Sequence, residues 1–212
     1  MSDILQEISE DVKKDKLKAF FKSYGIYFIT LLILILTLSI IWWQNYKRKQ
    51  VLRAAEEFNE AMMISSPEEA KDLEGRLKKL TYGDTIYAQL ASLQLAAFST
   101  YKEDYNKAFA EYNSLSENRK TVAAIRDYSN LMKIKVRIVS EKLAYDKAVE
   151  QLDDYIEKAT YFVAQAKFLR ANLLMKLNKP TEAKEDFNII ITDSVLPTPF
   201  IKISEMLAQS LK

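Results

Sequence analysis

Residues 128–156 read "YSNLMKIKVRIVSEKLAYDKAVEQLDDYI", and this segment is the clearest guide to the architecture of the chain. It reads as an amphipathic helix, a short polar turn and a second helix. Two further segments share this plan, "YAQLASLQLAAFSTYKEDYNKAFAEYNSL" at residues 87–115 and "AQAKFLRANLLMKLNKPTEAKEDFNIII" at residues 164–191. Recurring helical hairpins are typical of proteins in which each unit buries its apolar face against its neighbours. The sequence therefore predicts an all-α fold.

Small residues set the period of these hairpins. An alanine lies early in each second helix, at Ala108, Ala148 and Ala183. Two other positions keep a fixed spacing from it, a bulky residue four positions later (Tyr112, Leu152 and Phe187) and a small residue twelve positions earlier (Ala96, Val136 and Ala171). An alanine lets two helices approach closely, and the bulky residue fills the space toward the next pair. The period is close to the roughly 34 residues of a tetratricopeptide repeat, so we expect an α-solenoid of about four such hairpins.

A C-terminal capping helix is expected after the last hairpin. The segment "LPTPFIKISEMLAQSLK" stops the preceding helix with two prolines, because proline cannot continue a helix. It then places Phe200, Ile203, Leu207 and Leu211 on one face. The whole chain has only 3 Gly and 4 Pro, which also favours long uninterrupted helices.

An apolar run precedes the repeats, "YFITLLILILTLSIIWWQNYKRK" at residues 27–49. Residues 26–43 carry no charge and would form a helix of about 27 Å, close to the thickness of a hydrocarbon core. A core helix of a soluble domain and a cleaved signal peptide are the alternatives. Bulky residues stand where a signal peptidase would need small ones, and aromatic residues lie at both ends, as at membrane interfaces. We predict a cytoplasmic segment at 1–25, a transmembrane helix at 26–43 and a repeat domain at 44–212.

The orientation of this anchor follows only weakly from charge. Five lysines precede the span (Lys13, Lys14, Lys16, Lys18 and Lys22), and four basic residues follow it (Lys47, Arg48, Lys49 and Arg53). Because basic residues favour the cytoplasmic side, this balance leans toward a cytoplasmic N-terminus and leaves the opposite orientation open.

The composition provides little for catalysis. There is no Cys and no His, which removes thiol nucleophiles and the commonest general base and metal ligand. Adjacent acids such as Asp153 and Asp154 point about 100° apart on a helix and cannot share a substrate atom. With 31 basic and 29 acidic residues dispersed along the chain, no nucleic-acid-binding field is indicated. We predict a protein that is not an enzyme, with no cofactor, no metal, no small-molecule substrate and no nucleic acid.

The remaining function is binding of protein partners. In stacked helical hairpins the first helices line a groove whose exposed positions contact the partner. Counted from the second-helix alanines, the candidate groove residues are Asn130, Lys133 and Arg137 in the middle unit and Gln165, Phe168 and Asn172 in the next.

Four stretches carry a family resemblance: "SDILQEISEDVKKDKLKAFFKSYG", "AAEEFNEAM", "AIRDYSNLMKIKVRIV" and "AQAKFLRANLLMKLNKPTEAKEDFNIIITDSVLPTPFIKISEMLAQSL". Together they make the chain resemble the ancillary SecYEG translocon subunit family of bacterial single-pass inner-membrane proteins with a periplasmic tetratricopeptide-like domain, and most closely its alphaproteobacterial type. The resemblance implies a cytoplasmic N-terminus and periplasmic repeats. It also implies partnership with the Sec translocon, with membrane-anchored periplasmic chaperones and with exported chains.

Two functional hypotheses follow. The first is a membrane-anchored scaffold that handles exported proteins near the translocon. The alternative is an envelope structural or assembly factor that organises cell-wall or division machinery through the same repeats.

Overall fold

The computed structural model describes residues 2–63, 67–193 and 195–211, with the side chains of 2–21, 23 and 67–71 outside that description. Every regular element in these ranges is a helix, which confirms the all-α prediction. The helices are α1 (Ser2–Met62), α2 (Pro67–Leu80), α3 (Ile86–Tyr101), α4 (Tyr105–Glu117), α5 (Ala123–Val139), α6 (Tyr145–Lys158), α7 (Val163–Lys176), α8 (Pro180–Ile191) and α9 (Thr198–Ser210). The chain divides into two compact units, Met1–Leu52 and Arg53–Lys212.

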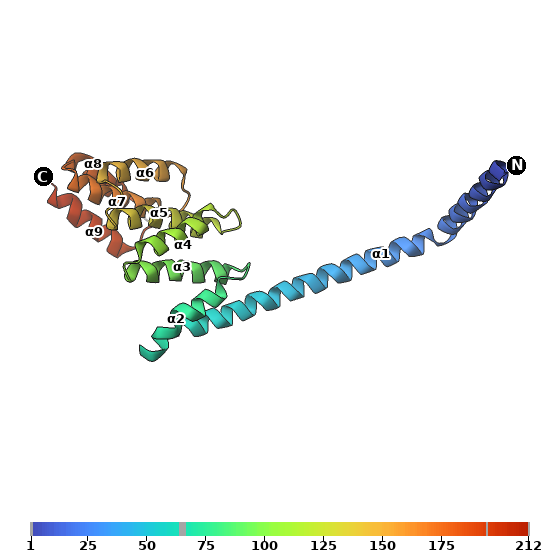
Figure 1. Ribbon diagram of the computed structural model, residues 1–212. Coiled ribbons are helices and arrows are strands. Elements are labelled where there is room, and N and C mark those ends of the chain that lie inside the picture. Colours follow the sequence, from blue (N-terminus) through green and yellow to red (C-terminus); the bar gives the residue numbers. More distant parts are fainter. Residues whose placement is uncertain (1, 64–66, 194, 212) are drawn as a thin grey trace. The chain divides into compact units, whose positions relative to one another are not determined.

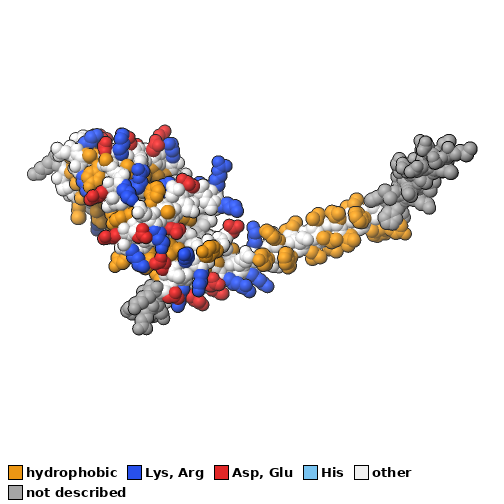
Figure 2. Space-filling view, in the orientation of Figure 1, with side chains coloured by type: hydrophobic (Ala, Val, Ile, Leu, Met, Phe, Trp, Pro, Cys, Tyr) orange, Lys and Arg blue, Asp and Glu red, His pale blue; other side chains and the backbone are white. Residues whose placement is uncertain are grey.

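The first unit contains the long apolar part of α1. This is the one helix in the described part of the chain that is long and apolar enough to cross a membrane, with a mean hydropathy of 2.4 over an 18-residue window of which nothing is buried. Figure 2 shows its apolar side chains as a band without charge. The hydroxyls of Thr30, Thr37 and Ser39 donate to backbone carbonyls three or four residues earlier, at 2.7–2.9 Å. These polar groups are therefore satisfied without water, as a lipid environment requires.

Aromatic and basic side chains gather at the C-terminal end of the apolar run. The rings of Trp42 and Tyr46 stack with centroids 5.9 Å apart. The ammonium of Lys47 lies 5.2 Å from the ring centroid of Trp43, within reach of a cation–π contact. Rings with one polar edge beside a cation suit the headgroup layer of a bilayer. The arrangement is consistent with a single-pass anchor.

The second unit stacks helical hairpins in chain order, and Figure 1 shows them from green to red. The three predicted hairpins are α3–α4, α5–α6 and α7–α8. The last turns of α1 and helix α2 form a further pair, in which Ala61 and Phe58 of α1 pack with Leu77 of α2 and Leu95 of α3. The prediction of about four hairpins is thus confirmed.

The predicted alanines lie at the contacts between helices. Ala108, Ala148 and Ala183 are all 0% exposed. The bulky residues one turn later, Tyr112, Leu152 and Phe187, are also 0% exposed. Each alanine shares a core cluster with its bulky partner, as the spacing rule requires.

Each of the three hairpins turns through one residue with a left-handed backbone. These residues are Glu103 (φ 60°), Glu141 (φ 58°) and Asn178 (φ 59°). In each case the backbone N–H of the next residue donates to a carbonyl five positions earlier, at 2.9 Å, which ends the first helix. The repeated geometry occurs without glycine, so the two glutamates hold a conformation that side chains disfavour.

Helix α9 closes the stack, but its packed face differs from the prediction. Leu207 and Leu211 pack against a cluster that contains Phe187 of α8, as expected. Ile203 is instead 47% exposed, while Ser204 is fully buried and donates to the carbonyl of Phe200 at 3.0 Å. A shift of one residue rotates the side chain by about 100°, which is enough to turn Ile203 outward.

An ion-pair network centred on Arg170 joins α6, α7 and α8. Arg170 of α7 donates from Nε and Nη2 to the two carboxylate oxygens of Asp186 of α8, at 2.8 and 2.6 Å. Its Nη1 also pairs with Asp153 of α6. Asp186 is only 2% exposed, so its charge depends on this arginine. The network fixes the relative position of three successive helices.

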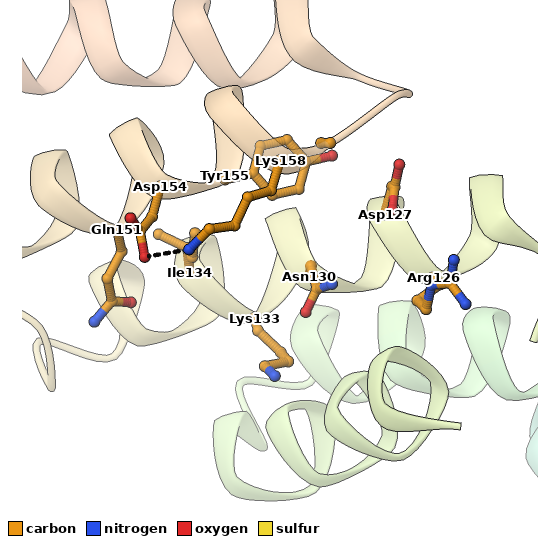
Figure 3. A pocket seen from close by; sticks show the side chains of 10 residues that line it. Arg126, Asp127, Asn130, Lys133, Ile134, Gln151, Asp154, Tyr155 and Lys158 are labelled. Atoms are coloured by element: carbon orange, nitrogen blue, oxygen red, sulfur yellow. Dashed lines mark hydrogen bonds and ion pairs between the residues drawn. The ribbon is translucent and has the colours of Figure 1, made fainter. Parts of the chain in front are cut away.

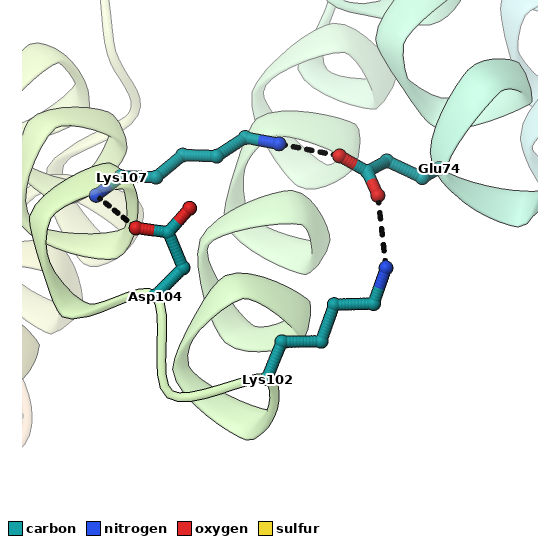
Figure 4. A network of polar contacts seen from close by, with 4 residues as sticks. All are labelled: Glu74, Lys102, Asp104 and Lys107. Carbon is teal, nitrogen blue, oxygen red and sulfur yellow. Dashed lines mark hydrogen bonds and ion pairs between the residues drawn. The ribbon is translucent and has the colours of Figure 1, made fainter.

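A second network fastens α2 to the next hairpin (Figure 4). The carboxylate of Glu74 accepts from Lys102 at 3.2 Å and pairs with Lys107 through its other oxygen. Asp104 caps α4 by accepting from the backbone N–H of Lys107 at 3.2 Å. The hydrogen bonds from Lys107 and then Lys102 lower the pKa of Glu74 from its ordinary value of 4.5.

This lowered pKa predicts how stability depends on pH. A carboxylate with a lowered folded pKa stabilises fully above its unfolded pKa and loses that contribution as pH falls through the folded pKa. Glu74→Gln should therefore lower the melting temperature at pH 7. The difference from the parent should begin to shrink as the pH falls toward 4.5 and should vanish only below the lowered pKa of folded Glu74. Thermal unfolding of the full chain in detergent, followed by circular dichroism, measures it. A difference that stays constant down to pH 3 would contradict the assignment.

The left-handed turn residues predict a stabilising substitution. Glu141→Gly removes the Cβ that clashes at positive φ, at the cost of a more flexible unfolded chain, so we expect a net gain of about 0.5–1 kcal/mol. Asn178→Gly should gain less, because asparagine tolerates this conformation. Glu141→Ala keeps the Cβ and is the matched control. Equal melting temperatures for the Gly and Ala variants would show that backbone strain is not the cause.

Candidate partner-binding groove

The core clusters show which first-helix residue faces each second-helix alanine. Ala96 packs in one cluster with Ala108, and Ala171 packs in another with Ala183. In the middle hairpin Ile134, not Val136, packs with Ala148. Val136 is buried in the α3–α4 cluster instead. The predicted spacing of twelve residues thus holds in the two outer hairpins and becomes fourteen in the middle one.

The difference comes from the turn between α5 and α6. The left-handed residue precedes the alanine by five positions in the outer hairpins, from Glu103 to Ala108 and from Asn178 to Ala183. It precedes the alanine by seven in the middle hairpin, from Glu141 to Ala148. Counting back twelve residues from Ala148 reaches Val136, which is two residues after Ile134, the true equivalent of Ala96 and Ala171. Two residues correspond to about 200° of helix rotation, so the face predicted for α5 lies opposite the equivalent one.

When the three hairpins are aligned on their left-handed turn residues, the residues at matching positions of α3, α5 and α7 line two apolar cavities. The first, of about 410 Å³, lies between α3 and α5 and is lined from α3 by Leu90, Leu93, Gln94 and Ala97. The second, of about 450 Å³, lies between α5 and α7, where the equivalent residues are Tyr128, Leu131, Met132 and Lys135 of α5 and Gln165, Phe168, Leu169 and Asn172 of α7. Tyr128 lines both cavities. We call the two together the apolar groove.

The sequence-predicted residues divide between this groove and the opposite face of α5. Gln165, Phe168 and Asn172 line the apolar groove, next to Phe200 of α9. Asn130 and Lys133 line a polar cavity between α5 and α6. The structure does not bring the two sets of residues into one groove, because the middle helix was predicted in the wrong register.

Arg137 lies apart from the other five candidates. It lines a small cavity of about 120 Å³ together with residues of α4, including Tyr105 and Phe109. Its Nη1 also donates to Oε1 of Gln151 on α6 at 3.4 Å. Arg137 therefore belongs to the polar side of α5.

An aromatic pair forms the wall between the two apolar cavities. The rings of Tyr128 and Phe162 meet edge to face with centroids 5.2 Å apart. Phe162 has φ 62°, which is strained for an aromatic residue. The preceding loop is held by Asp127, whose Oδ2 accepts from the backbone N–H groups of Thr160 and Tyr161 at 3.0 and 3.1 Å. The position of this wall is thus set by a carboxylate one residue from Tyr128.

The chemistry of the apolar groove suits apolar side chains. Lys135 is the one charged residue among those that line it. Three amide side chains, those of Gln94, Gln165 and Asn172, lie among the apolar residues, and Asn172 Nδ2 donates to the carbonyl of Phe168 at 2.6 Å. Apolar cavities with a few amides can hold side chains of a bound segment and hydrogen-bond its backbone.

Among the groove residues that the sequence prediction missed are four of α5, namely Tyr128, Leu131, Met132 and Lys135. The signal that could have found them is the apolar pattern of α5 itself, in which Leu131, Ile134 and Ile138 recur at helical spacing and mark Ile134 as a core position. Among the described residues, no group of three or more His, Cys, Asp or Glu could hold a metal ion.

Comparison with known families gives a match over most of the chain. A family model described as a tetratricopeptide repeat-like domain covers residues 18–194 of the chain. A search of the curated proteins and a search of the solved structures gave no match.

Proposed function

Because the chain belongs to the tetratricopeptide repeat-like domain family, we propose that it is a membrane-anchored, non-enzymatic scaffold that binds protein partners in its apolar groove. Domains of this kind are typically protein-interaction modules without catalytic activity. The long apolar part of α1 is consistent with the anchor. The scaffold is thus tethered by one helix and recognises partners through the repeats.

The observation that carries the proposal is the register of the three first helices. Equivalent positions of α3, α5 and α7 line two neighbouring cavities of about 410 and 450 Å³ that share Tyr128. Each cavity is large enough for one or two apolar side chains. A partner segment with apolar residues on both sides of the Tyr128 wall would bury them there, and this burial would supply most of the binding free energy.

The proposal also assigns a cellular location and specific partners. The N-terminus is cytoplasmic and the repeats are periplasmic in a bacterial inner membrane. The partners are the Sec translocon, a membrane-anchored periplasmic chaperone and exported chains. The resemblance to the ancillary SecYEG translocon subunit family supports these assignments, as does the small excess of lysines before the span.

Site-specific photo-crosslinking in intact cells tests the groove and its partners together. A benzophenone side chain replaces Lys135 or Gln165, which are exposed in the apolar groove, or Glu150, which is exposed on α6 as the matched control. We expect adducts with Sec or chaperone components from the two groove positions and none from Glu150. Equal adducts from all three positions would rule out the groove. Groove adducts made only with cell-wall or division proteins would instead favour the envelope assembly role.

A reporter fusion tests the orientation. Alkaline phosphatase folds into an active enzyme only after export, so fusion after Lys212 should give activity and fusion after Lys22, before the span, should give none. The reverse result would place the repeats in the cytoplasm and exclude periplasmic partners. Immunoblots of both fusions control for expression.

A further inference from the structure

A polar cleft opens between α5 and α6, on the face of α5 opposite the apolar groove (Figure 3). Its volume is about 460 Å³. The residues that matter for its chemistry are Arg126, Asn130 and Lys133 from α5, with Gln151, Asp154 and Lys158 from α6. This polar cleft belongs to the middle hairpin and is separate from the proposed partner groove.

Two features of the sequence explain why α5 and α6 leave a cleft between them. In the outer hairpins an alanine of the first helix, Ala96 or Ala171, faces the second-helix alanine. The middle hairpin has Ile134 at that position and two extra residues in its turn. A branched side chain holds two helices further apart than an alanine does. Accordingly, α5 and α6 pack less closely together than the helices of the outer hairpins.

The acidic side chains of the polar cleft are already engaged. Asp127 accepts the two backbone N–H groups of the loop before α7. Asp154 pairs with Lys158 one turn later on α6, at 3.1 Å. These two carboxylates offset only two of the three cations that line the polar cleft (Arg126, Lys133 and Lys158), so its lining carries one net positive charge.

Three cations follow one face of α5, and among the described residues none of them forms an ion pair. The guanidinium of Arg126 makes no ion pair or hydrogen bond among the described residues. Lys133 donates to the hydroxyl of Ser116 at 3.1 Å, and Arg137 to the amide oxygen of Gln151 at 3.4 Å, both neutral acceptors. Arg126 and Lys133 are seven residues apart, which is two helical turns or about 10.5 Å along the axis. Positive charge on the wall of a cleft attracts anionic groups.

Of the three cations, Lys133 gives the clearest indication of anion binding, because its side chain is partly buried. Burial lowers its pKa, and the nearby charge of Arg137 lowers it further, against an opposing effect of Glu117. A partly desolvated cation that makes no ion pair gains stabilisation of its charged form when an anion binds beside it.

We propose that the polar cleft between α5 and α6 binds an acidic segment of a protein partner, with its carboxylates accepting hydrogen bonds from Arg126 and Lys133. The volume is close to that of each apolar cavity and admits one or two side chains rather than a single ion, and the two cations lie far enough apart for two carboxylates. A flat lipid surface fits less well, because Lys133 lies recessed between helices. The polar cleft then adds a second, charge-selective site on the face opposite the apolar groove.

Fluorescence anisotropy with the full chain in phosphatidylcholine nanodiscs tests the proposal. The probes are a labelled acidic peptide, GSEEGEEGS, and its amide counterpart, GSQQGQQGS. We expect binding of the acidic peptide alone, weakened by salt because screening reduces attraction between charges. Lys133→Gln and Arg126→Gln should each raise its dissociation constant about tenfold, since each removes a charged hydrogen bond.

Lys135→Gln is the matched control, because it removes the same charge from the apolar-groove face of α5. It should leave acidic-peptide binding unchanged, and melting temperatures of all variants confirm folding. Equal binding of both peptides, or equal weakening by Lys133→Gln and Lys135→Gln, overturns the proposal. Displacement of the peptide by inorganic phosphate alone, or by phosphatidylglycerol in the nanodisc, also overturns it in favour of a general anion site or a lipid site. Because the polar cleft and the apolar groove share no lining residue, failure of the polar cleft to bind the peptide leaves the groove proposal standing.

Discussion

The arrangement of this protein depends on a geometric constraint of the α-helix, that each residue advances the side-chain direction by about 100°. The left-handed turn residue fixes where each first helix ends, and the small residue of the second helix fixes where the two helices meet. The middle hairpin has two extra residues between its left-handed turn residue, Glu141, and its second-helix alanine. Despite them, α5 turns the same face toward the apolar groove as α3 and α7 do. The two extra residues change only how α6 meets α5, and so one face of α5 lines the apolar groove while the other opens to the polar cleft.

The packing of each hairpin reflects the size of one first-helix residue. Ala96 and Ala171 allow close contact with the second helix, whereas Ile134 at the equivalent position does not. The middle hairpin compensates through polar links to its neighbours rather than through its own core. Asp127 holds the loop before α7, and Arg170 of α7 pairs with Asp153 of α6 and with the buried Asp186 of α8. Removing one partner of such a buried pair is far more costly than losing an exposed pair.

The two faces of α5 offer different chemistry to partners. The apolar-groove face presents Tyr128, Leu131 and Met132, which bind by burial of apolar surface. The polar-cleft face presents Arg126 and Lys133, which select for negative charge. A partner that reached both faces would gain affinity from the first and selectivity from the second, as interaction modules with separated apolar and charged contacts do.

The sequence by itself determined the helical class, the apolar run suited to a membrane, the repeats and the buried alanines with their bulky partners. These follow from local periodicity and composition, which do not depend on distant contacts. It also placed Gln165, Phe168 and Asn172 on one face of α7, where they line a single cavity, because the α7–α8 turn has the same length as the α3–α4 turn; their role in partner binding stays a prediction. The tertiary structure decided the face of α5 and the outward position of Ile203. The face that a first helix turns toward its neighbours depends on where the left-handed turn residue ends that helix and on which residue of the second helix it contacts. Counting back a fixed number of residues from the second-helix alanine gives neither of these positions.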